Sequence, residues 1–187
     1  MEMRVGAGNA KGRRLQTVPG RRVRPTSGRV REALFNTLRE TVPGSIFVDM
    51  FAGTGSVGLE ALSQGARHVY FVEKDRSALT VLRANIRHCG AGPQATVVAA
   101  ELPQALQMLP VTLQADVIFM DPPYASDLAR KTLGALDERG LLSLHGLIVW
   151  QHAAQRTALA LPRHELLLTR QYGNTQLSFL TPLKETR

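Results

Sequence analysis

Short apolar runs alternate with amphipathic stretches along most of this chain, a pattern that predicts strands alternating with helices. We expect strands at 46–50, 68–73, 96–100, 116–120 and 146–152. Apolar positions at helical spacing, with glycine or capping residues at the ends, predict helices that begin near residue 57 and at 76–88, 102–109 and 128–137. This order is typical of a doubly wound α/β fold with a parallel sheet.

The end of the chain departs from this alternation. Two further strand-like runs, 165–170 and 176–180, are separated by only five residues, which leaves no room for a helix. An antiparallel hairpin is therefore expected there. A parallel sheet that ends in an antiparallel hairpin differs from the ordinary dinucleotide-binding fold, in which the strands stay parallel.

The first 25 residues have a different character. Residues 3–23 are glycine-rich and basic with short apolar insertions, which favours a small hairpin or extended arm. Thr26 and Ser27 then stand ahead of an amphipathic helix whose apolar positions include Val30 and Leu34. We therefore expect a basic arm over 1–25 and one α/β domain over 26–187.

The positive charge is concentrated in the same region. The net charge is +8, and residues 1–31 hold nine Lys or Arg against one acidic residue, while the remainder is balanced. Arginines interleaved with valine and proline favour an ordered arm that meets phosphates, so nucleic acid is a better partner than solvent alone. The candidate RNA-binding residues are Lys11, Arg13, Arg14, Arg21, Arg22, Arg24, Thr26, Arg29 and Arg31.

Composition narrows the class of protein further. The chain has 187 residues, 44% of them hydrophobic, and no run approaches the roughly 20 apolar residues of a membrane span. The N-terminus lacks the apolar core of a signal peptide, so we expect a cytoplasmic protein. One cysteine, Cys89, excludes an internal disulfide and a cysteine-based metal cluster. We expect no metal site and a monomer.

The segment 47–62 reads as strand, tight turn and helix. Gly53, Gly55 and Gly58 fit the G-x-G-x-x-G pattern, which lets a nucleotide-like ligand approach the backbone, although close packing of a helix on a strand also requires glycine. Asp49, just before the turn, would repel a pyrophosphate and attract the α-ammonium of S-adenosylmethionine. The alternative is that Asp49 caps the turn backbone.

Acidic residues follow the other strands. Glu73 is placed to accept hydrogen bonds from ribose hydroxyls, and Glu101 follows the third strand. After the fourth strand comes Asp121-Pro122-Pro123-Tyr124, in which the prolines fix the backbone and free carbonyls to accept hydrogen bonds. Asp121 and the Pro122 carbonyl could accept the hydrogens of an exocyclic amine while Tyr124 stacks on the base. The alternative is a plain chain turn.

Together these residues resemble a known family, the bacterial small-subunit (16S) rRNA guanine-N2 methyltransferases, which are class I S-adenosylmethionine-dependent methyltransferases. The resemblance covers nearly the whole chain. It rests on the basic arm, on Arg24-Pro25-Thr26-Ser27-Gly28-Arg29-Val30-Arg31-Glu32-Ala33-Leu34-Phe35-Asn36, on residues 49–58, on Phe71-Val72-Glu73-Lys74-Asp75 and on residues 121–124. Many relatives have an acid where Gly28 stands.

The resemblance implies a Rossmann-like sheet of seven strands with the last one antiparallel. It also implies that residues 24–31 lie close to both cofactor and RNA. The implied cofactor contacts are Asp49, Phe51, Ala52, Gly53, Thr54, Gly55, Glu73, Lys74, Ala100 and Glu101, and the implied catalytic residues are Asp121, Pro122, Pro123 and Tyr124.

The sequence thus predicts methyl transfer from S-adenosylmethionine to the N2 amine of an unstacked or flipped guanine in small-subunit rRNA. Methylation of DNA adenine-N6 or of protein glutamine is an alternative, although the small arm leaves little chain for reading several DNA base pairs. A non-catalytic RNA-binding assembly factor is a further alternative. A nicotinamide-dependent oxidoreductase is disfavoured by Asp49 and by the terminal hairpin.

Overall fold

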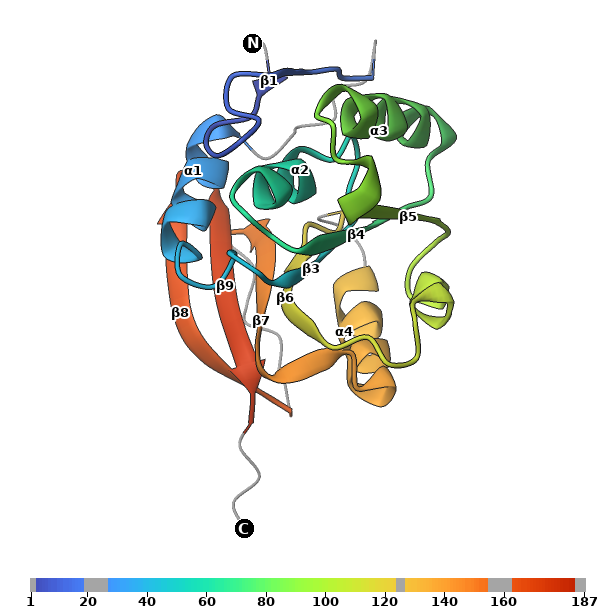
Figure 1. Ribbon diagram of the computed structural model, residues 1–187. Coiled ribbons are helices and arrows are strands. Elements are labelled where there is room, and N and C mark those ends of the chain that lie inside the picture. Colours follow the sequence, from blue (N-terminus) through green and yellow to red (C-terminus); the bar gives the residue numbers. More distant parts are fainter. Residues whose placement is uncertain (1–2, 19–26, 124–126, 155–162, 184–187) are drawn as a thin grey trace.

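A computed structural model describes residues 3–18, 27–123, 127–154 and 163–183 (Figure 1). Its centre is a seven-stranded sheet with the strand order β5-β4-β3-β6-β7-β9-β8. The strands are β3 (Ile46–Met50), β4 (His68–Glu73), β5 (Ala95–Ala99), β6 (Ala115–Met120), β7 (Leu142–Ala153), β8 (His164–Tyr172) and β9 (Thr175–Pro182). The first five are parallel, and β9 pairs antiparallel with β7 and β8. The predicted parallel sheet with its antiparallel hairpin is confirmed.

Several elements differ in length from the prediction, among them strand β7, the final hairpin and the helix over 102–109. Strand β7 begins at Leu142 rather than at residue 146, with a register irregularity opposite it between Ala115 and Val117. The final hairpin turns at Gly173 and Asn174 alone, because Tyr172 and Thr175 still pair in the ladder. Over 102–109 the helix is shorter, the 3₁₀ helix η2 (Gln104–Met108).

Helices cover both faces of the sheet (Figure 1). Alternate strand residues point to opposite faces, and this divides the interior into two apolar clusters. Phe47, Phe71 and Phe119 pack with α1 (Gly28–Thr37), α2 (Ser56–Ser63) and α3 (Arg76–His88). Met50 and Ile118 pack with η2 and α4 (Leu128–Arg139) on the other face. A one-turn 3₁₀ helix, η1 (Gly92–Gln94), precedes β5. Within the described ranges, no helix has the length and apolar character needed to cross a bilayer.

The N-terminal arm packs against the first of these faces. It forms a small hairpin of β1 (Met3–Arg4) and β2 (Arg14–Leu15), and Val5 and Leu15 are buried in the same cluster as helices α1 to α3. Gly8 lies so close to α2 that an added Cβ would stand 1.7 Å from the Ser63 carbonyl oxygen. Residues 3–18 therefore belong to the same packed body as the sheet, and the predicted boundary between residues 25 and 26 lies outside the described residues.

Candidate active site

The ladder register places three acidic residues on one face of the sheet, at the carboxyl ends of their strands. Asp49 in β3 pairs with Phe71 on one side and with Phe119 on the other. Glu73 and Asp121 stand two residues beyond these partners, and side chains two residues apart share a face. All three carboxylates therefore lie on the face that α1, α2 and α3 cover.

Asp49 lies deepest in this group. Its side chain is buried, and Oδ2 accepts a hydrogen bond from the Gly58 N–H at 2.8 Å. Asp49 therefore does bind backbone after the turn, as its alternative interpretation as a capping residue expects. Burial, aided by the charges of Asp121 and Glu73, raises the pKa of Asp49 to about 7 against the lowering effect of that hydrogen bond. A site with these neighbours favours a cationic guest over a phosphate.

The three glycines of the turn have different roles. Gly55 has a φ of +86°, and its Cβ would stand 2.4 Å from Leu82 Cδ1, while a Cβ on Gly58 would stand 2.3 Å from Phe71 Cε1. The left-handed backbone therefore favours glycine at position 55, and packing against Phe71 requires it at position 58. Gly53 has a φ of +55°, and within the described part of the chain no non-neighbouring atom lies within 4 Å of its Cβ position. Only Gly53 of the three faces open space that a ligand can occupy.

The turn continues the strand without a regular element. Phe51 has a φ of +64°, which a residue with a side chain seldom adopts, and the following Ala52 N–H donates to the Val72 carbonyl at 2.9 Å. This bond fastens the start of the turn to the neighbouring strand β4. The backbone at Phe51 and Ala52 is therefore tied directly to β4.

Glu73 joins the end of β4 to the turn. Oε2 accepts from the Gly53 N–H at 2.7 Å, and Oε1 accepts from the N–H groups of Lys74 and Asp75, both at 2.8 Å. An ionised carboxylate has about four acceptor positions, so roughly one remains beside the open space at Gly53. That position suits a ribose hydroxyl.

Lys74 and Glu101 are paired with each other. Their side chains form an exposed ion pair between Nζ and Oε1 at 2.5 Å, at the ends of the neighbouring strands β4 and β5. The hydrogen bond and charge of Glu101 raise the pKa of Lys74. Ala100, just before Glu101, is half-buried against the second apolar cluster. Lys74, Ala100 and Glu101, the residues expected near the adenine of the cofactor, thus lie together beside Glu73.

Asp121 directly follows β6. Burial raises its pKa to about 7, although a hydrogen bond from Gln151 Nε2 to Oδ2, 2.8 Å long, acts in the opposite direction. Pro122 is buried and Pro123 is exposed, while Tyr124 lies outside the described residues. The site therefore holds a carboxylate that titrates near neutral pH, with a fixed backbone carbonyl next to it.

The sequence analysis missed Gln151. It stands in β7, two residues beyond Val149, and Val149 pairs with Phe119. A glutamine directly after the apolar run 147–150 was a signal that its amide has a polar partner, because buried polar groups are nearly always hydrogen-bonded. Its position across the ladder from residue 121 indicates that this partner is Asp121.

Substituting Gln151 with Leu should raise the pKa of Asp121 further, because a hydrogen bond that stabilises the ionised carboxylate is lost. For a reaction in which Asp121 accepts a proton, we expect kcat to fall about tenfold near pH 7 and to recover at higher pH, with the midpoint displaced by about one pH unit. Gln114→Leu, at an exposed position whose amide donates to the Gly140 carbonyl, is the matched control. A pH profile identical in both variants would contradict this role for Gln151.

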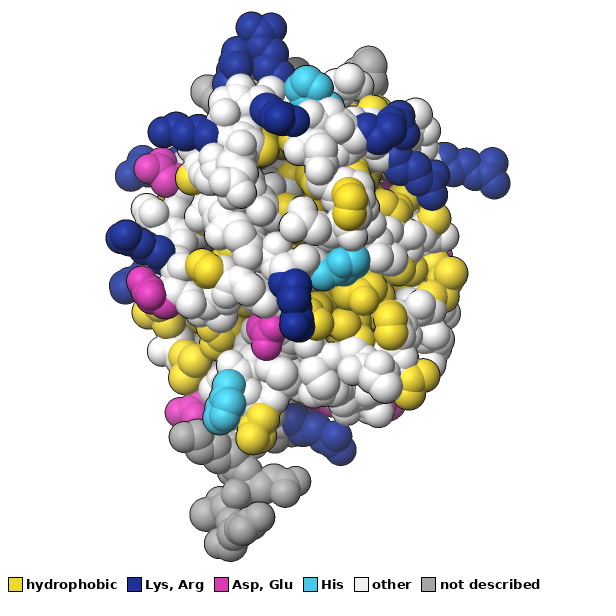
Figure 2. All heavy atoms as spheres, in the orientation of Figure 1, with side chains coloured by type: hydrophobic (Ala, Val, Ile, Leu, Met, Phe, Trp, Pro, Cys, Tyr) yellow, Lys and Arg dark blue, Asp and Glu magenta, His cyan; other side chains and the backbone are white. Residues whose placement is uncertain are grey.

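The structure separates the candidate RNA-binding residues into two groups. Lys11, Arg13, Arg14 and Arg29 are exposed, and Figure 2 shows Lys and Arg side chains gathered over the end of the molecule formed by the arm and α3. Arg31 is 7% exposed. Its Nε lies 3.3 Å from Glu60 Oε2, and Nη2 donates to the Arg4 carbonyl, so in this arrangement it fastens the arm instead of facing solvent. Arg21, Arg22, Arg24 and Thr26 lie outside the described residues.

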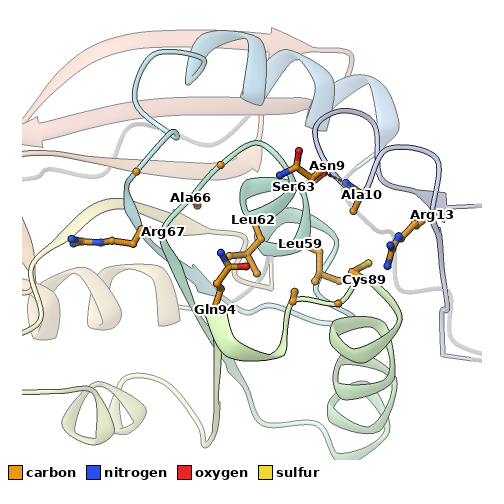
Figure 3. A pocket seen from close by; sticks show the side chains of 14 residues that line it. Asn9, Ala10, Arg13, Leu59, Leu62, Ser63, Ala66, Arg67, Cys89 and Gln94 are labelled. Atoms are coloured by element: carbon orange, nitrogen blue, oxygen red, sulfur yellow. Dashed lines mark hydrogen bonds between the residues drawn. The ribbon is translucent and has the colours of Figure 1, made fainter.

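A hollow of about 600 Å³ lies beneath the arm, at the opposite end of the sheet from the carboxylates (Figure 3). Arg13 and Ser63 stand at its edge, and Leu59, Leu62 and Cys89 line it. Burial raises the pKa of the Cys89 thiol. Asn9, Ala10 and Arg13 of the arm line one side of this hollow (Figure 3).

The sheet order, the antiparallel β9 and the carboxylates beside an open glycine turn define a class I methyltransferase, whose cofactor is S-adenosylmethionine. This cofactor fits the residues present, because it carries a sulfonium and an ammonium and has no phosphate. The model of the family described as conserved hypothetical protein 95 matches residues 3–181. The chain belongs to this family.

Individual relatives span most of the chain. YlbH of Bacillus subtilis is 34% identical over 181 residues, which is 92% of this chain and 95% of YlbH. Ribosomal RNA small subunit methyltransferase D of Haemophilus influenzae is 36% identical over 149 residues, 79% of this chain and 77% of its own length. The solved structure of Escherichia coli yhhF matches with a TM-score of 0.81 at 32% identity, covering 97% of this chain and 98% of yhhF. The predicted family, fold class and cofactor are confirmed.

Proposed function

We propose that this protein transfers a methyl group from S-adenosylmethionine to the exocyclic N2 amine of a guanine in small-subunit (16S) rRNA. The observation that carries the proposal is the Asp121 carboxylate, which Gln151 orients at 2.8 Å on the sheet face that also holds Asp49 and Glu73. The relative from Haemophilus influenzae is named for small-subunit rRNA, which supports the substrate class.

The residues of the first two strand ends would hold the cofactor. Asp49 would attract the α-ammonium, and the open space at Gly53 would hold the methionine part of the cofactor. Glu73 would accept a hydrogen bond from a ribose hydroxyl. Lys74, Ala100 and Glu101 stand on the adenine side. When bound, S-adenosylmethionine supplies a methyl group on a positively charged sulfur, which makes that methyl group open to direct displacement.

Asp121 and the Pro122 carbonyl would act on the substrate amine. Each accepts one of the two amine hydrogens, which directs the nitrogen lone pair toward the methyl group. As the new N–C bond forms, the C–S bond breaks with its electron pair left on sulfur, and the amine must lose one proton. Asp121 can accept that proton, because its pKa of about 7 lies near working pH. The target base must leave its stack to reach this position, with Tyr124 as its stacking partner.

Incubation with methyl-labelled cofactor and small ribosomal subunits that lack native methylation tests the proposal. Nuclease digestion and chromatography of the labelled RNA should recover the label as N2-methylguanosine. The same assay is run with DNA and with ribosomal protein as acceptors. Label on adenine, on a protein side chain or on no acceptor at all would refute guanine-N2 methylation of rRNA.

Neutralising Arg13, Arg14, Arg21 and Arg22 together should weaken RNA binding and flatten its dependence on salt. Each lost phosphate contact lowers the slope of log K against log salt by about 0.7 to 0.9, so four contacts would lower it by about 3. A matched control removes four exposed charges from α4 and β8 and their vicinity: Arg130, Lys131, Arg163 and Arg170. An equal change of slope in both variants would assign the effect to net charge and not to the arm.

A further inference from the structure

Asn85 in α3 connects the N-terminal arm to the glycine turn. The side chain is fully buried and makes three hydrogen bonds to the backbone. Oδ1 accepts from the Gln16 N–H at 2.8 Å, and Nδ2 donates to the Gln16 carbonyl at 3.0 Å. Nδ2 also donates to the Thr54 carbonyl at 2.9 Å. One amide therefore contacts both the arm and the turn that holds the cofactor.

This amide depends on both of its partners. A buried polar group without a hydrogen bond costs about 1–3 kcal/mol, and Asn85 shares its helix face with apolar Leu82 and Ile86. If the arm moves away from α3, Asn85 Oδ1 loses the Gln16 N–H and Asn85 Nδ2 loses the Gln16 carbonyl. The orientation that holds the Thr54 carbonyl is then no longer fixed.

The rest of the arm is held mainly at α2. Glu60 accepts from the N–H groups of Gly6 and Ala7 at 2.7 and 2.8 Å, and Ser63 Oγ accepts from the Ala10 N–H at 2.8 Å. Next to these bonds, Asn9, Ala10 and Arg13 of the arm line one side of the hollow in Figure 3. Contacts to Glu60 and Ser63 do not involve the turn, whereas the contact to Asn85 does, so the two kinds of anchor can be tested separately.

We propose that Asn85 is a positioning residue that makes arm docking and cofactor binding mutually dependent. With cofactor on the turn, the arm is held in its docked form and binds RNA more tightly, and RNA on the arm strengthens cofactor binding by the same factor. The RNA half of this proposal rests on the proposed function. We expect a coupling factor of about 5 to 20.

Titration calorimetry measures this factor from the affinity of S-adenosylhomocysteine with and without a small-subunit rRNA transcript. Asn85→Asp replaces the donor amide with an oxygen that repels both carbonyls, and the coupling factor should fall to about 1. Gln16→Pro removes the N–H on the arm side, fixes φ at residue 16 and leaves the buried Asn85 in place, so the coupling should be lost here too if Asn85→Asp fails to fold. Ser63→Ala is the matched control, because it loosens the arm without touching the turn and should retain the coupling.

Hydrogen exchange at the Gln16 amide gives a readout that needs no RNA. S-adenosylhomocysteine should slow this exchange about fivefold in the unaltered protein and in Ser63→Ala, and not in Asn85→Asp.

If both ligands bind the unaltered protein independently, the coupling is refuted while the proposed function stands. If rRNA is not methylated but exchange still responds to S-adenosylhomocysteine, the proposed function fails and the link through Asn85 stands. A coupling lost equally in Ser63→Ala would refute the special role of Asn85.

Discussion

Replacing Asp121 with Asn or Ala is expected to lower kcat for methyl transfer by about 10³-fold while changing cofactor affinity less than about threefold. Asn keeps the size of the side chain and an oxygen that can accept from Gln151, and it cannot take a proton from the amine. The loss should therefore appear in single-turnover transfer and not in calorimetric binding of S-adenosylhomocysteine.

The two substitutions distinguish orientation from proton transfer. Asp121→Ala removes both functions, and Asp121→Asn retains the hydrogen bond to Gln151, so activity in the Asn variant that exceeds the Ala variant measures orientation alone. If either variant loses cofactor binding and transfer to the same degree, Asp121 belongs to the cofactor site and not to the substrate amine.

Asp49→Asn should weaken cofactor binding and stabilise the ligand-free protein. The carboxylate is isolated from water, and its charge would attract the cofactor's ammonium, so we expect the dissociation constants of S-adenosylmethionine and S-adenosylhomocysteine to rise about 10- to 100-fold. The Asn oxygen can still accept from the Gly58 N–H, which keeps the turn intact.

The stabilising effect has a defined pH dependence. The pKa of Asp49 is 3.8 in an unperturbed chain and about 7 in the fold, so the folded state binds more protons and its stability falls as pH rises from about 4 to about 7. The Asp49→Asn variant does not lose this stability as pH rises, because its side chain does not ionise. Its advantage in the free energy of unfolding should grow over that interval, to the order of a few kcal/mol, and stay constant above it.

Thermal or urea unfolding between pH 4 and 8 measures this advantage. Asp116→Asn is the matched control, because Asp116 also accepts a backbone N–H, that of Ile46 at 2.8 Å, at the opposite end of the sheet. We expect Asp116→Asn to leave cofactor affinity unchanged. A pH-independent difference for Asp49→Asn, or equal loss of cofactor affinity in both variants, would contradict the role given to Asp49.

Sequence periodicity predicted the sheet and the positions of the acidic residues, because both follow from local pattern. The order of strands and helices needs only the spacing of apolar positions, and each strand end then places Asp49, Glu73 or Asp121 at one edge. The same pattern does not say which glycine faces a ligand. That distinction between Gly53 and Gly58 depends on the distance to Phe71, which belongs to another strand.

Contacts between distant segments were not predictable in this way. Arg31 looked like part of a basic surface stretch, yet it is buried against Glu60, 29 positions away in the sequence. Asn85 and Gln16 are 69 positions apart, and neither stands in a recognisable motif. A polar residue at a buried helix position indicates that a partner exists, and only the packed structure identifies the partner.

The packing of the N-terminal arm on α2 and α3 has a consequence for the order in which the chain can fold during synthesis. The arm leaves the ribosome before α2 and α3, because Glu60, Ser63 and Asn85 follow 53 to 69 positions behind the residues they hold. Until α3 has emerged, the backbone N–H groups of Gly6, Ala7, Ala10 and Gln16 lack some or all of the side chains that accept from them. A nascent chain arrested before residue 85 should therefore expose the arm to protease, and one arrested well beyond residue 88 should protect it.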